Sequence, residues 1–181
     1  MVAVQNYTVE EFEHFVMLPE NAGKNFEFIG GEIVEIIPNS YSSQVAMQIG
    51  AQITLYVNKH CLGFVTGADG GYMIGGERYI PDVGFISKAK QSQPPHDTYI
   101  PDAPDLAVEV ISPTDQPRPT RIKIIKYLEA GTIVWVVDPE TKTVEVYTPG
   151  PQVNTLDLSG TLDGGAILPG FTLPVQDIFP E

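Results

Sequence analysis

Short runs of apolar and polar residues alternate along most of this chain, and glycine or proline separates one run from the next. Such runs are typical of β-strands with one buried face. The first two, over 26–29 and 32–36, lie on either side of Gly30-Gly31 and predict a hairpin in which Phe26 and Phe28 share one face and Glu27 takes the other. Further strands are predicted over 63–66, 72–74, 79–87, 106–111, 132–137 and 143–147.

Helical spacing appears in three segments. A short helix is predicted after Thr8, which forms a capping box with Glu11. A long helix is predicted over 44–60, where apolar residues recur every four positions, after a turn over 38–43. A third is predicted over 118–130, ending at Gly131. Its apolar face is assigned to Ile124, Ile125 and Leu128, with Lys123 at the border.

The order of these elements predicts an α+β fold. A strand, a helix and a strand between 105 and 137 indicate a mixed central sheet with helices on its faces. Residues 88–104 contain four prolines and are expected to form a surface loop. We expect one domain over 1–181, with a core over 24–150, an added N-terminal hairpin, and a β-rich C-terminal extension over 151–181. The extension carries strand patterns at 153–158 and 171–175.

Composition narrows the class of protein. Hydrophobic residues make up 43% of the 181 positions, as in globular proteins, and no apolar run is long enough to cross a bilayer. The first residues lack the pattern of a signal peptide. The single cysteine, Cys61, rules out an internal disulfide, so a cytoplasmic location is expected. The net charge of −13 argues against a broad nucleic-acid surface but leaves room for a small metal site.

Two strands contain carboxylates where apolar residues are expected. Asp82 lies in Ile80-Pro81-Asp82-Val83, and Glu109 interrupts Leu106-Ala107-Val108-Glu109-Val110-Ile111. A buried carboxylate is costly unless it is paired or binds a metal. If the two strands are neighbours, Asp82 and Glu109 can share one cation, and carboxylate oxygens suit Mg²⁺ or Mn²⁺. The metal would activate water for phosphodiester hydrolysis.

Other polar residues have simpler explanations beside their functional ones. Lys123, in the helix after Glu109, is the lysine expected to assist the water, or a solvated helix residue. A salt bridge to Lys123 or Arg121 equally explains Glu109, and Asp82 can simply cap a turn. Glu27 opposes an aromatic face and can point into the site as an auxiliary ligand or proton acceptor. Glu32 and Asp105 are more simply surface and strand-start residues.

The chain also resembles a family. The arrangement of Asp82, followed by Glu109 with a residue two positions on, is similar to the PD-(D/E)XK nuclease superfamily. Residues 24–150 resemble the Uma family of restriction-endonuclease-like proteins, a domain of unknown function. The matching stretches are Phe26-Glu27-Phe28-Ile29-Gly30-Gly31-Glu32, Pro81-Asp82-Val83, Pro104-Asp105-Leu106-Ala107-Val108-Glu109-Val110-Ile111-Ser112-Pro113, Lys123-Ile124-Ile125-Lys126-Tyr127-Leu128-Glu129-Ala130-Gly131 and Val134-Trp135-Val136-Val137-Asp138-Pro139.

The resemblance implies a core of one helix, three antiparallel strands, a second helix and a further strand. Two positions depart from the pattern. Ile111 replaces the lysine expected two residues after the glutamate, and Lys123 is the matching substitute. Ser43-Gln44 stands where relatives usually carry a histidine.

These observations favour a metal-dependent endonuclease or phosphodiesterase, with Asp82 and Glu109 as metal ligands, Lys123 and Glu27 assisting, and DNA as a candidate substrate. A small phosphate ester is a second candidate substrate. The competing hypothesis is a catalytically inactive nuclease fold that serves as a regulatory or protein-binding scaffold. A homodimer is expected, with the 143–147 hairpin or the tail in its interface, since nuclease-like domains of this size commonly act as two-fold pairs.

Overall fold

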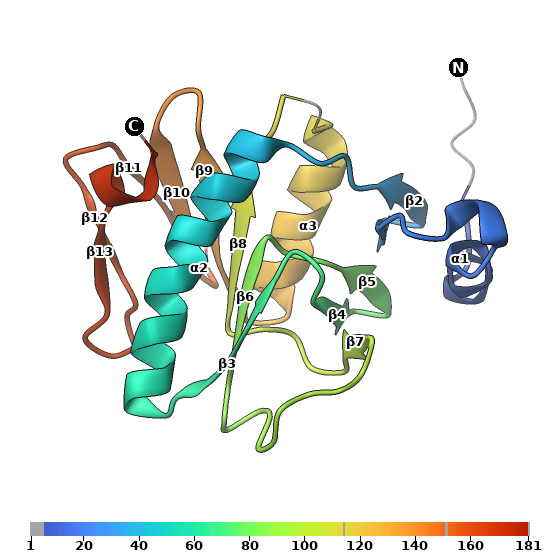
Figure 1. The fold of residues 1–181 in the computed structure, drawn as a ribbon, viewed down its shortest axis with the longest axis horizontal. Helices are drawn as coiled ribbons and strands as arrows, with labels where there is room; N and C mark the ends of the chain where they lie inside the picture. Colours follow the sequence, from blue (N-terminus) through green and yellow to red (C-terminus); the bar gives the residue numbers. More distant parts are fainter. Residues whose placement is uncertain (1–5, 114, 151, 181) are drawn as a thin grey trace.

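A computed structural model describes residues 6–113, 115–150 and 152–180 of the chain, which form an α+β fold (Figure 1). Two of its α-helices cover opposite faces of a central sheet, and a shorter one lies at the edge of the molecule. The helices are α1 (Val9–Val16), α2 (Ser40–His60) and α3 (Pro117–Glu129), with 3₁₀ turns η1 (Pro19–Asn21) and η2 (Val175–Ile178).

The central sheet has six strands in the order β11-β10-β9-β8-β6-β3. Their bounds are β3 (Gly63–Gly67), β6 (Val83–Ser87), β8 (Leu106–Val110), β9 (Ile133–Asp138), β10 (Thr143–Tyr147) and β11 (Val153–Leu156). Strands β8 and β9 pair in parallel and are joined through α3, whereas the other neighbouring pairs are antiparallel. A crossover helix is the usual way to connect two parallel strands of one sheet.

A second sheet of five strands, in the order β2-β1-β5-β4-β7, faces α3, and a two-stranded sheet lies in the tail. The bounds are β1 (Phe26–Ile29), β2 (Glu32–Glu35), β4 (Gly71–Ile74), β5 (Glu77–Tyr79) and β7 (Tyr99–Ile100) in the five-stranded sheet, and β12 (Thr161–Asp163) and β13 (Thr172–Pro174) in the tail. The β1–β2 hairpin turns at Gly30 and Gly31, both of which have positive φ.

The predicted fold class is confirmed. The order α2-β3-β6-β8-α3-β9 contains the helix, the three antiparallel strands, the second helix and the further strand that the resemblance implies. The hairpin of 143–147 with the preceding strand is also confirmed. The tail buries Leu162, Leu168 and Phe171 in the same apolar cluster as α2.

Several element boundaries differ from the predicted ones. The segment 79–87 is two strands in different sheets, because Pro81 has no N–H with which to continue a ladder. Helix α2 begins at Ser40, since the side chain of Asn39 accepts hydrogen bonds from the N–H groups of Tyr41 and Ser42. The Pro-rich loop contains the short strand β7, and the tail contains β12 in addition to the predicted strands.

Alternation along β8 divides the core into two layers. Leu106, Val108 and Val110 pack in the cluster that contains α2, whereas Ala107 packs in the cluster that contains α3 and the second sheet. Because side chains alternate across a strand, Glu109 lies on the α3 side with Ala107. The side chain of Glu109 is therefore directed into the space between the two sheets.

The central position of β8 gives a stability prediction. Leu106 is 0% exposed, so Leu106→Ala leaves a cavity and should lower the free energy of unfolding by about 2–5 kcal/mol. The matched control is Leu158→Ala, the same change at a side chain that is 43% exposed, which should cost about 0.5 kcal/mol or less. Urea unfolding measures both. Equal shifts of the two midpoints would contradict the assigned core.

Candidate active site

A lysine from α3 joins the two sheets through an ion-pair network. The Nζ atom of Lys123 lies 2.8 Å from Oε1 of Glu27 on β1 and 2.7 Å from Oε2 of Glu109 on β8. All three side chains are nearly inaccessible to solvent, with exposed fractions of 8%, 6% and 13% for Lys123, Glu27 and Glu109. The cluster therefore consists of one ammonium group between two carboxylates in a buried environment.

The orientation of α3 that creates this network differs from the predicted one. The buried residues of the helix are Lys123 and Tyr127, which lie four positions apart on one face. Ile125, assigned to the apolar face, is 54% exposed. Lys123 points inward because the carboxylates of Glu27 and Glu109 pair with its ammonium there. A prediction that assigns only apolar residues to the buried face of a helix misplaces such a lysine.

Asp82 lies beside this network at the start of β6. The register of β6 and β8 pairs Val83 with Val108, so the antiparallel pairing continued by one residue sets Asp82 opposite Glu109. The Oδ2 atom of Asp82 accepts a hydrogen bond of 2.7 Å from the N–H of Val110. The structure thus brings Asp82, Glu109, Lys123 and Glu27 together from β6, β8, α3 and β1.

Hydrogen bonds fix the orientation of the other two carboxylates. The N–H of Ile80 donates to Oε1 of Glu27 over 2.7 Å, and the hydroxyl of Tyr127 donates to Oε1 of Glu109 over 3.1 Å. The ring of Tyr127 packs edge-on against Tyr79, with ring centroids 5.4 Å apart. The donors are backbone groups or a packed ring, which leaves the carboxylates little rotational freedom.

Burial and mutual repulsion shift the pKa values of these groups. Burial raises the pKa of Asp82, while the Val110 N–H and Lys123 oppose the rise. Burial, and then the charges of Glu27 and Asp82, raise the pKa of Glu109 to about 8 against the effect of Lys123. Burial alone would lower the pKa of Lys123, but Glu109 and Glu27 hold it well above its ordinary value. The ammonium therefore keeps its proton.

Carboxylate oxygens are the donor type that a hard divalent cation prefers. Within the described ranges, Oδ1 of Asp82 accepts no hydrogen bond, and the carboxylate of Glu109 lies across the strand pair from it. Burial is the main cause of the raised pKa values of Asp82 and Glu109, and repulsion among the acidic groups adds to it. The described residues contain no group of three or more His, Cys, Asp or Glu arranged to hold a metal. Protein ligands would therefore be few, and water would complete the shell, as is common for Mg²⁺.

The remaining sequence candidates lie outside the cluster. Glu32 pairs with Arg118, and Asp105 accepts a 2.7 Å hydrogen bond from the N–H of Ser87 at the far end of β8. Ser43 and Gln44 are exposed on α2, while the neighbouring Ser42 is buried and donates a 3.3 Å hydrogen bond to the carbonyl of Ile111. Asp105 and Ser42 form hydrogen bonds next to the two ends of β8, and none of these residues has a described contact with the Glu109 carboxylate.

Tyr127 is the residue that sequence reasoning did not select for the site. Its hydroxyl contacts Glu109, and its ring is fully buried. Burial and the charges of Glu109 and Glu27 raise its pKa well above the ordinary value, so it remains a hydrogen-bond donor. Its spacing of four residues from Lys123 was the available signal, because helical residues at that spacing share a face.

The raised pKa of Glu109 gives a prediction with a defined sign. Between 4.5 and about 8 the folded protein binds more protons than the unfolded chain, so stability should fall as the pH rises through this window, by at most about 1.4 kcal/mol per pH unit. Glu109→Gln removes the titrating group. The variant should match the wild type near pH 5 and exceed its stability at pH 8 in urea unfolding. A constant difference at both pH values would contradict this assignment.

Comparisons with known proteins place the fold and the family. No curated protein matches the chain. Among solved structures, one described as a putative nuclease belonging to DUF820 from Anabaena variabilis ATCC 29413 shares the fold, with a TM-score of 0.81 and 21% identity over 92% of this chain and 96% of that one. In the described part of the chain no helix is long and apolar enough to cross a membrane. The model of the Uma2 family, described as putative restriction endonuclease, matches residues 9–176. The chain therefore belongs to the Uma2 family and has a nuclease-like fold.

Proposed function

We propose that this protein is a metal-dependent endonuclease that hydrolyses phosphodiester bonds at the cluster around Glu109. The observation that carries the proposal is the convergence of Asp82, Glu109 and Lys123 on adjacent strands and the following helix, in a chain of a nuclease family. Lysine beside a carboxylate pair combines a group that handles water or phosphate with oxygen donors for a hard cation. We place its activity in the cytoplasm, since the one cysteine, Cys61, is a free thiol.

Each residue of the cluster would have its own role in the reaction. Asp82 and Glu109 would hold Mg²⁺ or Mn²⁺, which supplies charge neutralisation at the phosphate and lowers the pKa of water. Lys123 would place its ammonium against the attacking water or the phosphate oxygen. Glu27 would hold Lys123 in position and accept a proton. The Val110 N–H and the Tyr127 hydroxyl keep the two ligand carboxylates oriented.

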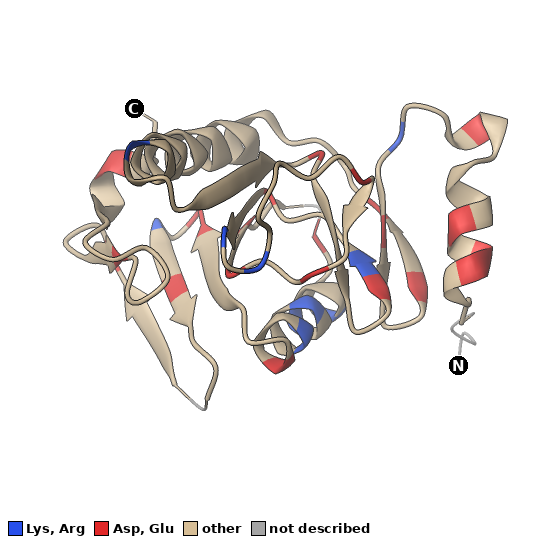
Figure 2. Ribbon diagram, turned by 90° about the horizontal axis from the view of Figure 1, so that it is seen from below, with Lys and Arg blue, Asp and Glu red and all other residues tan. Residues whose placement is uncertain are grey.

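A DNA substrate must approach a chain with a net charge of −13. The basic residues are unevenly distributed, and Figure 2 shows several of them on α3. Four of the ten lysines and arginines of the chain belong to this helix: Arg118, Arg121, Lys123 and Lys126. Lys123 is buried, so the accessible Arg118, Arg121 and Lys126 make α3 the element along which a nucleic-acid backbone would lie.

A second candidate function is a catalytically inactive scaffold. The observation that favours it is the ion pair of Lys123 with Glu27 and Glu109, which gives both carboxylates a cationic partner without a metal. Hydrogen bonds from Lys123 and Tyr127 already occupy both oxygens of Glu109. Metal binding separates the two functions, because a purely structural ion pair has no need of a divalent cation.

The first test of the proposal is metal affinity. Asp82→Asn and Glu109→Gln each remove a charged ligand, so calorimetric titration with Mn²⁺ should show heat for the wild type and none for either variant. Glu32→Gln is the control, because this carboxylate pairs with Arg118 outside the cluster and should leave the Mn²⁺ affinity unchanged. An affinity for Mn²⁺ that is the same in Glu109→Gln as in the wild type would overturn the metal role.

The second test concerns the lysine. Lys123→Ala should lower hydrolysis of DNA or of a small phosphodiester by about 100-fold or more, while most Mn²⁺ binding remains, since an ammonium stabilises charge and is not a ligand. The change also leaves two buried carboxylates without their partner, so unfolding must be measured alongside. Lys24→Ala, which removes an ion pair with Glu35 outside α3, is the control for the loss of one positive charge.

A rescue variant separates chemistry from folding. Ile111 lies two residues after Glu109 and packs in the apolar cluster of Tyr127, so a lysine there can direct its ammonium toward the site. The double variant Ile111→Lys with Lys123→Ala should recover part of the hydrolysis. Equal hydrolysis by the wild type and by Lys123→Ala would refute the catalytic role. A wild type that cleaves no substrate with any of several divalent metals would favour the scaffold.

A further inference from the structure

The outward face of α2 is uncharged, although the protein as a whole is strongly acidic. Residues 40–58 contain no Asp, Glu, Lys or Arg, and the first charged side chain of the helix is Lys59 near its end. Charged residues make up 18% of the chain, so a neutral stretch of this length on an exposed helix is unexpected. Helices on protein surfaces normally present charged residues to water.

Large apolar side chains project from the same face. Met47 and Leu55 are 70% and 67% exposed, and Ala51 between them is exposed as well. The buried face is separate and is formed by Val45, Ile49, Ile53 and Val57. The exposed apolar residues are therefore in excess of those that hold α2 on the sheet, and burying them requires contact with a second surface.

The net charge of the chain indicates which kind of surface would cover this face. Two copies with a net charge of −13 repel each other wherever acidic faces meet. The outward face of α2 carries none of this charge, so it is a face through which copies can associate without opposing like charges. Basic partners, in contrast, would be drawn to the acidic surfaces elsewhere on the molecule.

The spacing of the side chains suits two-fold symmetry. Met47 and Leu55 each lie four residues from Ala51, so two antiparallel α2 helices crossing at Ala51 would set Met47 of each copy against Leu55 of the other. Such reciprocal contacts are what an isologous interface requires. A small residue at the crossing point also lets two helix axes approach closely.

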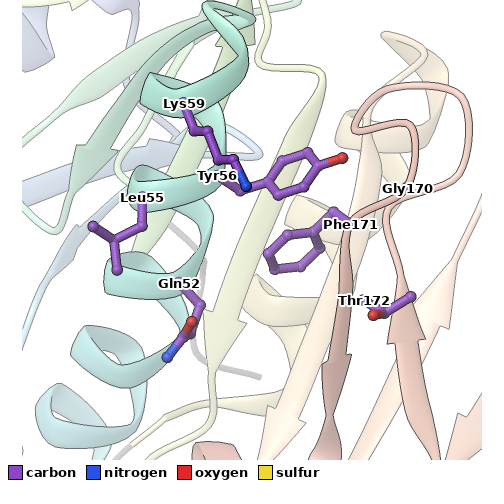
Figure 3. A pocket seen from close by; sticks show the side chains of 7 residues that line it. All are labelled: Gln52, Leu55, Tyr56, Lys59, Gly170, Phe171 and Thr172. Carbon is purple, nitrogen blue, oxygen red and sulfur yellow. The ribbon is translucent and has the colours of Figure 1, made fainter.

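A hollow of about 330 Å³ lies beside this face. It is lined by α2 and by the tail, through Gln52, Leu55, Tyr56, Lys59, Gly170, Phe171 and Thr172. Figure 3 shows Tyr56 directed toward Phe171, whereas Leu55 projects from the other side of the helix. In the antiparallel arrangement the partner copy's Met47 packs against Leu55 on the outward face, and the hollow lies at the rim of the contact.

We propose that the protein forms a two-fold homodimer through the outward face of α2, with Ala51 at the symmetry axis and the tail at the rim. The expected interface therefore moves from the 143–147 hairpin to α2. Strand β10 is paired on both sides, with β9 and β11, which leaves it no free edge for a second chain. The proposal does not depend on the nuclease function.

Charge insertion on the full chain tests the interface. Met47→Glu and Leu55→Glu each place a carboxylate on an exposed position, so the fold should tolerate them, and each should weaken the dimer by about 100-fold or more. Light scattering over a concentration series measures the mass. The matched control is Val153→Glu on β11, an exposed apolar residue of the hairpin region, which should leave the dimer intact.

Cross-linking tests the symmetry axis. In a Cys61→Ser background, Ala51→Cys should form a disulfide-linked dimer under mild oxidation, because residues at the crossing point approach within disulfide range. Ile125→Cys, exposed on α3, should not. A monomeric wild type at high micromolar concentration would overturn the proposal and leave this face to a different protein. Dissociation by Val153→Glu but not by Leu55→Glu would instead assign the interface to the hairpin.

Discussion

The ammonium of Lys123 is the contact on which the arrangement of the two sheets depends. It bridges Glu27, from the five-stranded sheet, and Glu109, from the six-stranded sheet, while its own helix connects the parallel strands β8 and β9. Removing one member of a buried ion pair typically costs about 3–5 kcal/mol, because the remaining charge has neither water nor partner. Lys123 is the member on which the other two depend, because its removal leaves two buried carboxylates without a cationic partner.

In the proposed function, the same contact affects how a cation binds at Glu109. A cation that binds Glu109 must compete with an ammonium already 2.7 Å from its carboxylate. Asp82 changes this balance, since it lies opposite Glu109 and adds a negative charge that Lys123 does not neutralise by direct contact. In the proposed function, Glu27 would keep its contact with Lys123 when Glu109 binds a cation, so the ammonium would not be left unpaired. Two carboxylates on one lysine, with a third nearby, are thus more than a purely structural ion pair requires.

Sequence patterns predicted the features that depend on neighbouring residues. They missed the features that depend on contacts between residues far apart in the chain. The order of helices and strands follows from periodicity, and Glu109 was recognisable because it interrupts an apolar strand. The predicted buried face of α3 was wrong. Hydrophobic spacing assigns Ile125 to the interior and Lys123 to the border of the apolar face. In the structure, ion pairs with Glu27 and Glu109 hold Lys123 in the interior. The contact of Tyr127 with Glu109 depends on the same orientation of α3, which buries both Lys123 and Tyr127. The split of 79–87 depends on Pro81 and on Ile80, whose N–H bonds to Glu27 instead of a strand.

Strand β8 also separates the ion-pair cluster from α2. Its alternate residues direct Leu106, Val108 and Val110 toward α2 and Glu109 toward α3, so the ion pair of Glu109 with Lys123 lies on the α3 side of the central sheet. Helix α2 covers the other side, as Figure 1 shows, and needs no charge to hold its place. If two copies meet through α2, their clusters lie on the outer faces of the pair, away from the interface. Each site would then meet its substrate independently, and pairing would act on stability rather than on joint cleavage of one duplex position.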